Sequence, residues 1–367
     1  MLMEQTLGHV THYQNLSSIL RGDERVEATF LPISYEMQSR WRWLPMYRNW
    51  TVRGGARVRK ALRVASATST YDVLFVHTQA LATLLSRRLF RRPVVISLDA
   101  TPLQYDELGV YYVHRRNGRL AEWAKKQINQ RQLRAAAHVV SWSQWAKRSL
   151  IDDYHVDAHK ISVIAPGVDR TVWGAADGAK RSDGVVTVLF VGGDLRRKGG
   201  SDLLAAFCAA RARLAAAPTP VQLELVLVTA GTIEPQPAVT VHSSMKPNSP
   251  ELISCYRNAD IFCLPTHGDC LPMVLSEASA CGLPVISTSV GAIEEIVVHG
   301  ETGLVVPVGD IAALTDALCQ LGSDSALRRS MGTAGAARVA ELFDARRNAA
   351  SLVEVFASLD RKSMTRG

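Results

Sequence analysis

The sequence has no cysteine in its first half, and none of its cysteines forms a C-x-x-C pair or a spacing typical of a metal site. We interpret them as reduced cytosolic thiols that mostly fill small core positions. Apolar runs are short, and none approaches the ~20 residues of a membrane-spanning helix. The N-terminal stretch also lacks a signal-peptide pattern. These absences favour a cytoplasmic protein. The cysteines are Cys208, Cys255, Cys263, Cys270, Cys281 and Cys319.

Acidic residues are missing from 37–71, where eight Lys and Arg alternate with aromatic residues. Basic side chains attract anionic lipid headgroups, and Trp side chains favour the membrane interface. The segment could therefore form a membrane patch on the inner face of the membrane, or simply a solvated basic face with buried tryptophans. Nucleic acid is not expected, because no RNA-binding motif accompanies the aromatics. The patch residues are Arg40, Trp41, Arg42, Trp43 and Trp50.

The length of 367 residues exceeds the usual size of a single core and predicts two domains. The charged residues are also distributed unevenly between two parts of the chain. Residues 1–170 carry 25 Lys and Arg against 14 Asp and Glu, whereas acids slightly exceed bases in the remainder. The two parts are therefore expected to meet different partners.

The stretch 261–287 is the most informative. An apolar run at 261–264 predicts a buried strand, a polar loop follows at 266–270, and a helix is expected from Leu271 or Pro272 to about Cys281. A second strand is expected at 285–287. Such a unit places a helix N-terminus at the carboxyl end of a parallel strand, where backbone N–H groups can hold a diphosphate without a metal.

Two carboxylates flank this helix entrance. Asp269 precedes it, and Glu277 shares a helix face with Met273 and Val274. Together they could clamp different hydroxyls of a sugar nucleotide. From spacing alone it remains equally open that Asp269 caps the helix and Glu277 is solvated.

The region 269–310 resembles the donor-binding motif of the retaining family 4 glycosyltransferases, which have the GT-B fold. The matching pattern is an acidic residue, seven others, a glutamate and A-x-A-x-G-x-P-V, followed by G-x-x-E and G-x-x-G-L-V-x-x-x-G-D. Its residues here are Asp269, Glu277, Ala278, Ala280, Gly282, Pro284, Val285, Gly291, Glu294, Gly300, Gly303, Leu304, Val305, Gly309 and Asp310. The family usually has Glu where this chain has Asp269, one bond of about 1.5 Å shorter.

A second glycine-rich turn at 192–200 follows an expected strand at 185–191. Glycines allow close approach of backbone to phosphate, and a lysine neutralises it. The resemblance assigns Lys198 to the leaving diphosphate and implies that Arg196 or Arg197 supplies a charge, since Gly193 stands where relatives carry arginine. The implied donor-binding set is Gly192, Gly193, Arg196, Arg197, Lys198, Asp269, Leu271, Pro272, Met273, Val274 and Glu277.

The acceptor side is expected in the first domain, past the ends of its strands. Candidates are Gly8 and His9, which follow a first strand of only three or four residues, together with His77 and Asp99. A chain start upstream of Met1 would also explain the short strand, and we favour that interpretation. The resemblance implies a histidine near the reacting sugar carbon where this chain has Asp99. Asp99 could stabilise positive charge or bind an acceptor hydroxyl, or it could merely cap the turn before Pro102.

The predicted fold class is α/β: a GT-B arrangement of two doubly wound, Rossmann-like domains facing each other across a cleft. We expect an acceptor-side domain at 1–168, a linker at 169–184, a nucleotide-sugar domain at 185–344 and a helix at 345–367 returning to the first domain. The resemblance implies metal-independent, cofactor-free transfer of a hexose from a UDP- or GDP-sugar to a glycan or lipid hydroxyl, with Asp269, Lys198 and Asp99 as catalytic residues. Alternatives are a nucleotide-sugar epimerase and a silent sugar-nucleotide-binding subunit.

Overall fold

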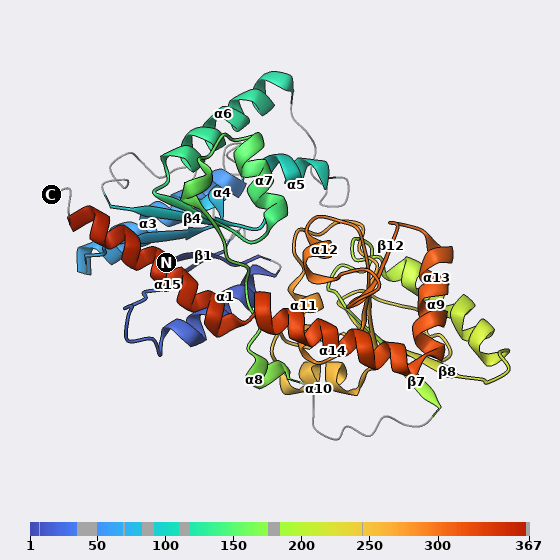
Figure 1. The fold of residues 1–367 in the computed structure, drawn as a ribbon. Coiled ribbons are helices and arrows are strands. Elements are labelled where there is room, and N and C mark those ends of the chain that lie inside the picture. Colours follow the sequence, from blue (N-terminus) through green and yellow to red (C-terminus); the bar gives the residue numbers. More distant parts are fainter. Residues whose placement is uncertain are drawn as a thin grey trace. The chain divides into compact units, whose positions relative to one another are not determined.

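The chain folds as two compact units, each built on a parallel sheet (Figure 1). The computed structural model describes residues 1–6, 8–34, 50–68, 70–82, 92–109, 118–174, 184–243 and 245–364. The first unit contains the described residues up to Pro166 and those from Ala345 onward. The second contains those between Gly167 and Asp344. The predicted α/β fold class is therefore confirmed.

The first unit has a six-stranded sheet in the order β2-β1-β3-β4-β5-β6, with every neighbouring pair parallel. Its shortest interior strand is β1, which pairs on both sides. The strands are β1 (Leu2–Glu4), β2 (Leu31–Ile33), β3 (Leu74–His77), β4 (Val94–Leu98), β5 (His138–Ser141) and β6 (Ile161–Val163). The helices are α1 (His9–Leu20), α3 (Trp50–Thr68), α4 (Gln79–Ala82), α5 (Pro102–Glu107), α6 (Arg119–Ala135), α7 (Gln144–Asp152) and α15 (Ala345–Met364). A 3₁₀ turn covers Ala158–Lys160.

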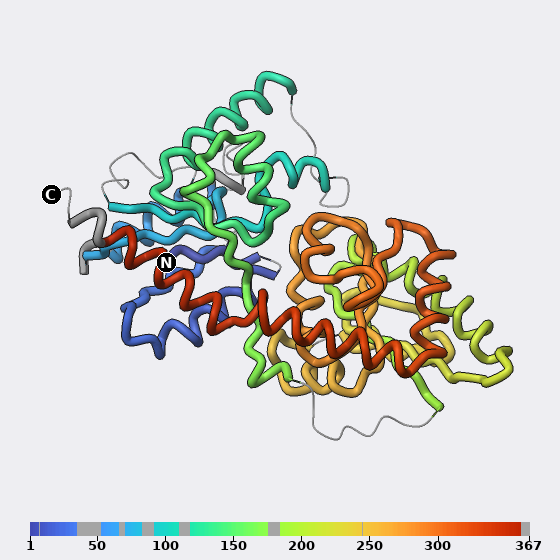
Figure 2. Tube along the Cα trace, viewed as in Figure 1, coloured from blue at the N-terminus to red at the C-terminus, as the bar shows by residue number. Residues whose placement is uncertain are grey.

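Alternate residues of these strands face opposite sides of the sheet, as pleating requires. Leu2, Val76 and Ile96 belong to a core shared with α3, α4, α6 and α7. Their neighbours, such as Met3 and Phe75, pack instead with α1 and α15. Figure 2 shows the red C-terminal helix beside the blue α1, two segments far apart in sequence. The final helix thus completes the core of the first unit.

The second unit has a six-stranded parallel sheet in the order β12-β11-β10-β7-β8-β9. Its strands are β7 (Val185–Val191), β8 (Gln222–Val228), β9 (Val239–His242), β10 (Ile261–Leu264), β11 (Val285–Thr288) and β12 (Gly303–Val306). Its helices are α8 (Arg170–Trp173), α9 (Gly200–Ala215), α10 (Pro250–Asn258), α11 (Met273–Ala280), α12 (Ile293–Ile296), α13 (Ile311–Ser323) and α14 (Ser325–Leu342). The strand order changes direction at β7 and β10, and this is where ligands bind in such sheets.

The expected linker differs from the structure at its start. The segment from Arg170 to Trp173 forms α8 and belongs to the second unit. Trp173 is buried, its ring centroid lies 5.1 Å from that of Tyr256, and its indole N–H donates to Asn248 at 3.3 Å. A buried tryptophan with a partner for its N–H fixes this segment to the second unit. The helical periodicity of the segment is too weak for this to be predicted from the sequence.

Within the described part of the chain, no helix has the length and apolarity needed to cross a membrane.

Candidate functional site

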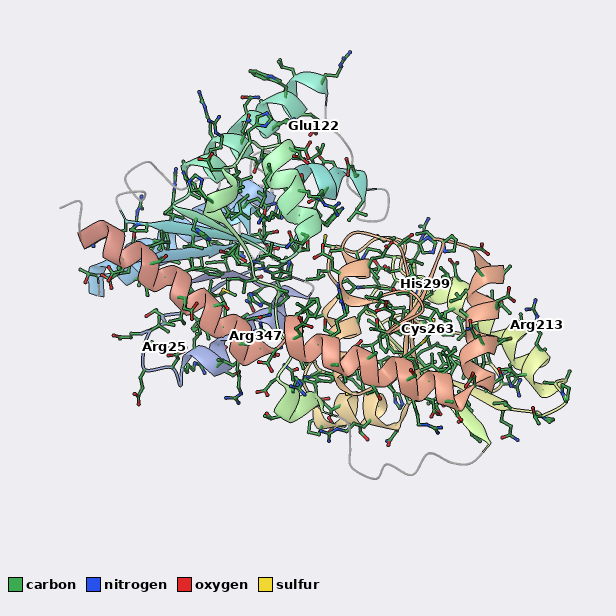
Figure 3. All side chains as sticks on the ribbon, in the orientation of Figure 1. Arg25, Glu122, Arg213, Cys263, His299 and Arg347 are labelled. Atoms are coloured by element: carbon green, nitrogen blue, oxygen red, sulfur yellow. The ribbon has the colours of Figure 1, made fainter. Side chains whose placement is uncertain are left out.

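Two loops of the second unit come together because β7 and β10 are parallel neighbours. The first loop, 192–199, leads from β7 to α9, and the second, 265–272, leads from β10 to α11. Figure 3 labels the buried Cys263 on β10, just before the second loop. Gly199 has a φ of 73°, and a Cβ there would lie 1.9 Å from the carbonyl oxygen of Pro265. Only glycine permits this approach of the two loops.

An ion cluster joins the loops. The Lys198 ammonium contacts the Asp269 carboxylate directly. The Arg197 guanidinium lies 3.7 Å from the same carboxylate and donates to the carbonyl oxygen of Gly268 at 2.8 Å. The Thr266 hydroxyl donates to the backbone oxygen of Arg197 at 3.2 Å. The exposed Asp194 also lies 3.6 Å from the Arg197 guanidinium. The cluster therefore holds two cations and two carboxylates at the end of the sheet, and an anionic group can bind there by replacing a carboxylate as partner of a cation.

The predicted cations of the first loop differ in their surroundings. Arg197 is buried and Lys198 is half-buried, whereas Arg196 and Gly193 are exposed. Gly192 is buried, and a Cβ there would lie 3.0 Å from the Lys198 side chain. Arg197 is therefore the arginine that the structure places beside Asp269.

The predicted helix at the second loop begins two residues later than its earliest expected start. It is α11, which has Pro272 as N-cap and no side-chain cap. Leu271, Pro272 and Met273 are buried, and Val274 is half-buried. The first N–H groups of a helix lack intrahelical partners, so an uncapped N-terminus next to two cations favours an anion.

Glu277 lies on α11 with a partner of its own. It is buried, and the Tyr256 hydroxyl donates to its carboxylate at 3.1 Å. Burial raises the pKa of Glu277 to about 7, although the Tyr256 hydrogen bond acts in the opposite direction. The same burial and the Glu277 charge raise the pKa of Tyr256. Asp269 and Glu277, predicted as one clamp, thus have separate protein partners in this structure.

A second polar cluster lies in the first unit, at the carboxyl ends of β1, β3 and β4. His9 Nδ1 lies 3.3 Å from Glu4, and His9 Nε2 lies 3.4 Å from Asp99. Glu4 also accepts from the Thr78 hydroxyl at 2.6 Å. Asp99 accepts from the Tyr105 hydroxyl at 2.7 Å and from the backbone N–H of Ala100 at 2.9 Å. The two carboxylates therefore hold one imidazole between them.

Aromatic rings complete this cluster. His77 stacks on Trp142, with centroids 4.8 Å apart, and His9 meets the edge of His77 at 4.6 Å. His12 lies 4.9 Å from Trp142. These three histidines are buried. Gly8, the remaining predicted acceptor-side residue, is exposed at the N-cap of α1.

The histidines of the cluster differ in charge. Burial opposes a charge on His9, but the hydrogen bonds and charges of Asp99 and Glu4 outweigh it and raise the pKa of His9 to about 10. Burial and the charge of His9 lower the pKa of His12 to about 3. His77 has a pKa well below its ordinary value for the same reasons. At neutral pH one imidazolium therefore lies among two neutral imidazoles.

Several residues of the two clusters were not predicted as site residues from the sequence: Glu4, His12, Tyr105, Trp142, Tyr256 and Thr266. Glu4 ends β1 as Asp99 follows β4, so a search for polar residues at all strand ends would have found it. The others depend on contacts between distant segments, which no local pattern carries.

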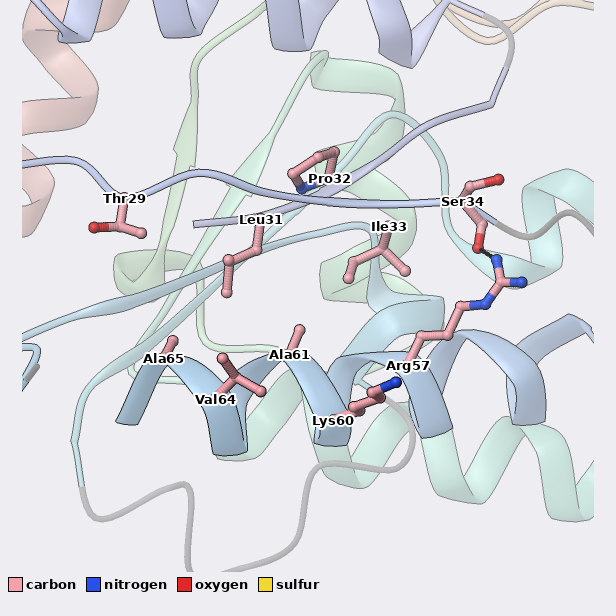
Figure 4. A pocket seen from close by; sticks show the side chains of 10 residues that line it. All are labelled: Thr29, Leu31, Pro32, Ile33, Ser34, Arg57, Lys60, Ala61, Val64 and Ala65. Carbon is pink, nitrogen blue, oxygen red and sulfur yellow. Dashed lines mark hydrogen bonds between the residues drawn. The ribbon is translucent and has the colours of Figure 1, made fainter. Parts of the chain in front are cut away.

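The predicted membrane patch falls largely outside the described residues, which is true of Arg40, Trp41, Arg42 and Trp43. Trp50 begins α3, but its side chain also lies outside the described part. The described remainder of this region borders a pocket between β2 and α3 (Figure 4). There Arg57 donates to the carbonyl oxygen of Ser34, and exposed Lys60 lines the pocket together with Leu31 and Val64.

In the described part of the chain, no group of three or more His, Cys, Asp or Glu side chains is arranged to hold a metal ion.

Two family models match the chain. The model described as "Glycosyl transferases group 1" matches residues 185–324, and "Glycosyltransferase Family 4" matches residues 18–172. The D-inositol 3-phosphate glycosyltransferase of Pseudarthrobacter chlorophenolicus is 29% identical over 62% of this chain and 57% of its own length. The protein of the same name from Arthrobacter sp. is 32% identical over 56% of this chain and 52% of its own. The chain spans about half the length of these curated relatives.

Solved structures share the fold over almost the whole chain. Sucrose-phosphate synthase from Thermosynechococcus elongatus has a TM-score of 0.71 at 20% identity, covering 98% of this chain and 95% of that one. HepE from Anabaena, solved in complex with UDP-glucose, has a TM-score of 0.69 at 16% identity, covering 97% and 99%. At such identities the likeness concerns the fold alone.

Proposed function

The chain belongs to the glycosyltransferases with the GT-B fold, and from this premise we propose that it transfers a hexose from a UDP- or GDP-sugar to an acceptor hydroxyl. The observation that carries the proposal is the cluster of Lys198, Arg197 and Asp269 beside the uncapped N-terminus of α11. A nucleoside diphosphate needs such a set of cations and free N–H groups.

The diphosphate of the donor takes the place of Asp269 as partner of Lys198. Breaking the bond between the sugar carbon and the phosphate oxygen places negative charge on the leaving diphosphate. Lys198, Arg197 and the α11 N-terminus stabilise that charge as it develops. The Asp269 carboxylate, released from Lys198, accepts a hydroxyl of the transferred sugar. Asp269 keeps the Arg197 guanidinium, 3.7 Å away, as its charged partner.

Glu277 binds the ribose of the donor. Its carboxylate already accepts one hydrogen bond from Tyr256, at 3.1 Å, and ribose hydroxyls supply further donors. Hydrogen bonds to an ionised carboxylate favour the charged form, so donor binding lowers the pKa of Glu277.

The first unit binds the acceptor at the His9 cluster. Because Asp99 already accepts from His9, Tyr105 and Ala100, we assign it a positioning role: it fixes the orientation and charge of His9. The acceptor oxygen forms the new bond to the sugar carbon, and its proton passes to an oxygen of the leaving diphosphate. The configuration at that carbon is retained, and neither a protein nucleophile nor a metal takes part.

The acceptor is a glycan or glycolipid at the inner face of the membrane, in keeping with the basic, aromatic composition of residues 37–71.

Product analysis with purified protein tests this function. UDP- and GDP-hexoses are incubated with and without a polyprenyl-linked or free glycan acceptor, in buffer containing EDTA, and products are identified by mass and by the anomeric coupling in NMR spectra. We expect an α-linked product from an α-linked donor, only when acceptor is present, and its loss in Lys198→Met. Formation of an epimer of the donor sugar without any acceptor would establish an epimerase instead. Binding of donor without any turnover would indicate a silent subunit.

A further inference from the structure

The outer face of α6 exposes large apolar side chains. Leu120 is 79% exposed, Trp123 61% and Ile128 48%. The buried side of the helix carries Asn129 and Leu133 instead. In a folded domain a single exposed apolar residue needs no explanation, but three on one helix mark a contact surface.

Basic side chains surround these three residues. Four basic residues of α6 are exposed: Arg119, Lys126, Arg131 and Arg134. The only acidic residue of the helix is Glu122, labelled in Figure 3, which is half-buried and lies 3.5 Å from Lys125. Lys125 in turn pairs with Asp106 at 2.8 Å. The acidic side chain of α6 is thus paired with Lys125, and the outer face of the helix is positively charged.

Helical spacing brings the apolar and basic groups onto one stripe. Leu120, Trp123, Arg131 and Arg134 follow one another at intervals of three, eight and three residues, which return to the same side of a helix. At 1.5 Å per residue, this stripe runs for about 21 Å from Leu120 to Arg134 along the helix. This is the pattern of a helix that lies in the plane of a membrane surface, with Trp and Leu in the headgroup layer and Arg beside lipid phosphates.

We propose that α6 docks the first unit on an anionic lipid surface. The charge of the face selects this occupant. A second copy would bring two basic faces together, and like charges at close range oppose that contact. Nucleic acid would leave Leu120 and Trp123 in water. The proposal goes beyond the transfer reaction and does not depend on it.

Vesicle flotation of the full chain tests the proposal, with phosphatidylcholine vesicles that either contain or lack phosphatidylglycerol. We expect wild type to float only with phosphatidylglycerol. Each basic residue near an anionic surface raises partitioning about fivefold. Arg131→Gln with Arg134→Gln should therefore lower it more than about tenfold, and Leu120→Ser with Trp123→Ser should lower it similarly.

Matched controls come from the second unit, where Ile311 and Leu342 are each 41% exposed and Arg211 and Arg329 are also exposed. Ile311→Ser with Leu342→Ser, and Arg211→Gln with Arg329→Gln, should float like wild type. Stabilisation by nucleotide should be the same in all variants. A loss of membrane binding can therefore be distinguished from a loss of donor binding.

Three results would overturn the proposal: no flotation of wild type, equal flotation with both vesicle types, or α6 variants that float like the controls. An oligomer of wild type in sedimentation that the α6 variants abolish would assign the face to a second copy instead, and would equally overturn it.

Discussion

Replacement of Glu277 by Gln should change how the stability of the second unit depends on pH. Burial raises the pKa of Glu277 from 4.5 to about 7 in the folded chain. The folded state therefore keeps a proton that the unfolded state loses as pH rises from 4.5 to 7. Where the folded state binds more protons, stability falls with rising pH. Ligand-free wild type thus loses stability across this window because of Glu277.

The size of the effect follows from the pKa. A rise from 4.5 to about 7 corresponds to about 3 kcal/mol, lost once the pH exceeds 7. Gln resembles the protonated carboxyl in shape but cannot ionise. Its stability relative to wild type should therefore improve by up to about 3 kcal/mol between pH 4.5 and 8. For a domain of this size that is roughly 6–12 °C in melting temperature.

Thermal unfolding of wild type and Glu277→Gln without nucleotide, from pH 4.5 to 8, measures this difference. Glu251→Gln serves as the control, because Glu251 is exposed on α10 and hydrogen bonds lower its pKa. Its difference from wild type should not shift in favour of the variant as pH rises. A constant difference between wild type and Glu277→Gln, or one that shifts toward wild type at high pH, would refute the account of Glu277.

Three further changes test other parts of the structure. Asp99→Asn removes a partner that raises the pKa of His9 to about 10, so NMR should show His9 titrating near neutral pH in the variant and still protonated at pH 8 in wild type. Gly199→Ala should destabilise the second unit by more than about 2 kcal/mol in urea unfolding, because its φ is 73° and its Cβ would strike Pro265; a smaller loss would contradict the close approach. Ser143→Ala removes the N-cap bond to Ala146 of α7 and should cost about 1 kcal/mol, whereas an unchanged urea midpoint would show that the cap contributes nothing.

Much of the fold is encoded locally. The strands at 185–191 and 261–264 were predicted with the bounds that the structure has, because each is an apolar or β-branched run between turn residues. The helix at 325–342 begins at a local signal as well, because the Asp324 side chain accepts from the backbone N–H of Leu327. Ser143 caps α7 in the same way by accepting from the backbone N–H of Ala146.

The contacts that form the two clusters are not encoded locally. Lys198 and Asp269 are 71 residues apart, and His9 and Asp99 are 90 apart. Strand order predicts that such residues approach the same edge of a sheet, but it does not predict which carboxylate pairs with which cation. The edge strand β2 was missed for a related reason. It has only three residues, includes Pro32, and is defined by its pairing with β1 rather than by its own pattern.

Calorimetric titration with UDP and GDP tests the central claim most directly, using wild type, Glu277→Gln, Lys198→Met and the exposed control Glu251→Gln. The account predicts that wild type and Glu251→Gln bind one of the two nucleotides with equal affinity. It also predicts that Glu277→Gln and Lys198→Met each bind it at least about tenfold more weakly, a loss of about 1.4 kcal/mol or more. Failure of wild type to bind either nucleotide, or unchanged affinity in both site variants, would contradict the account.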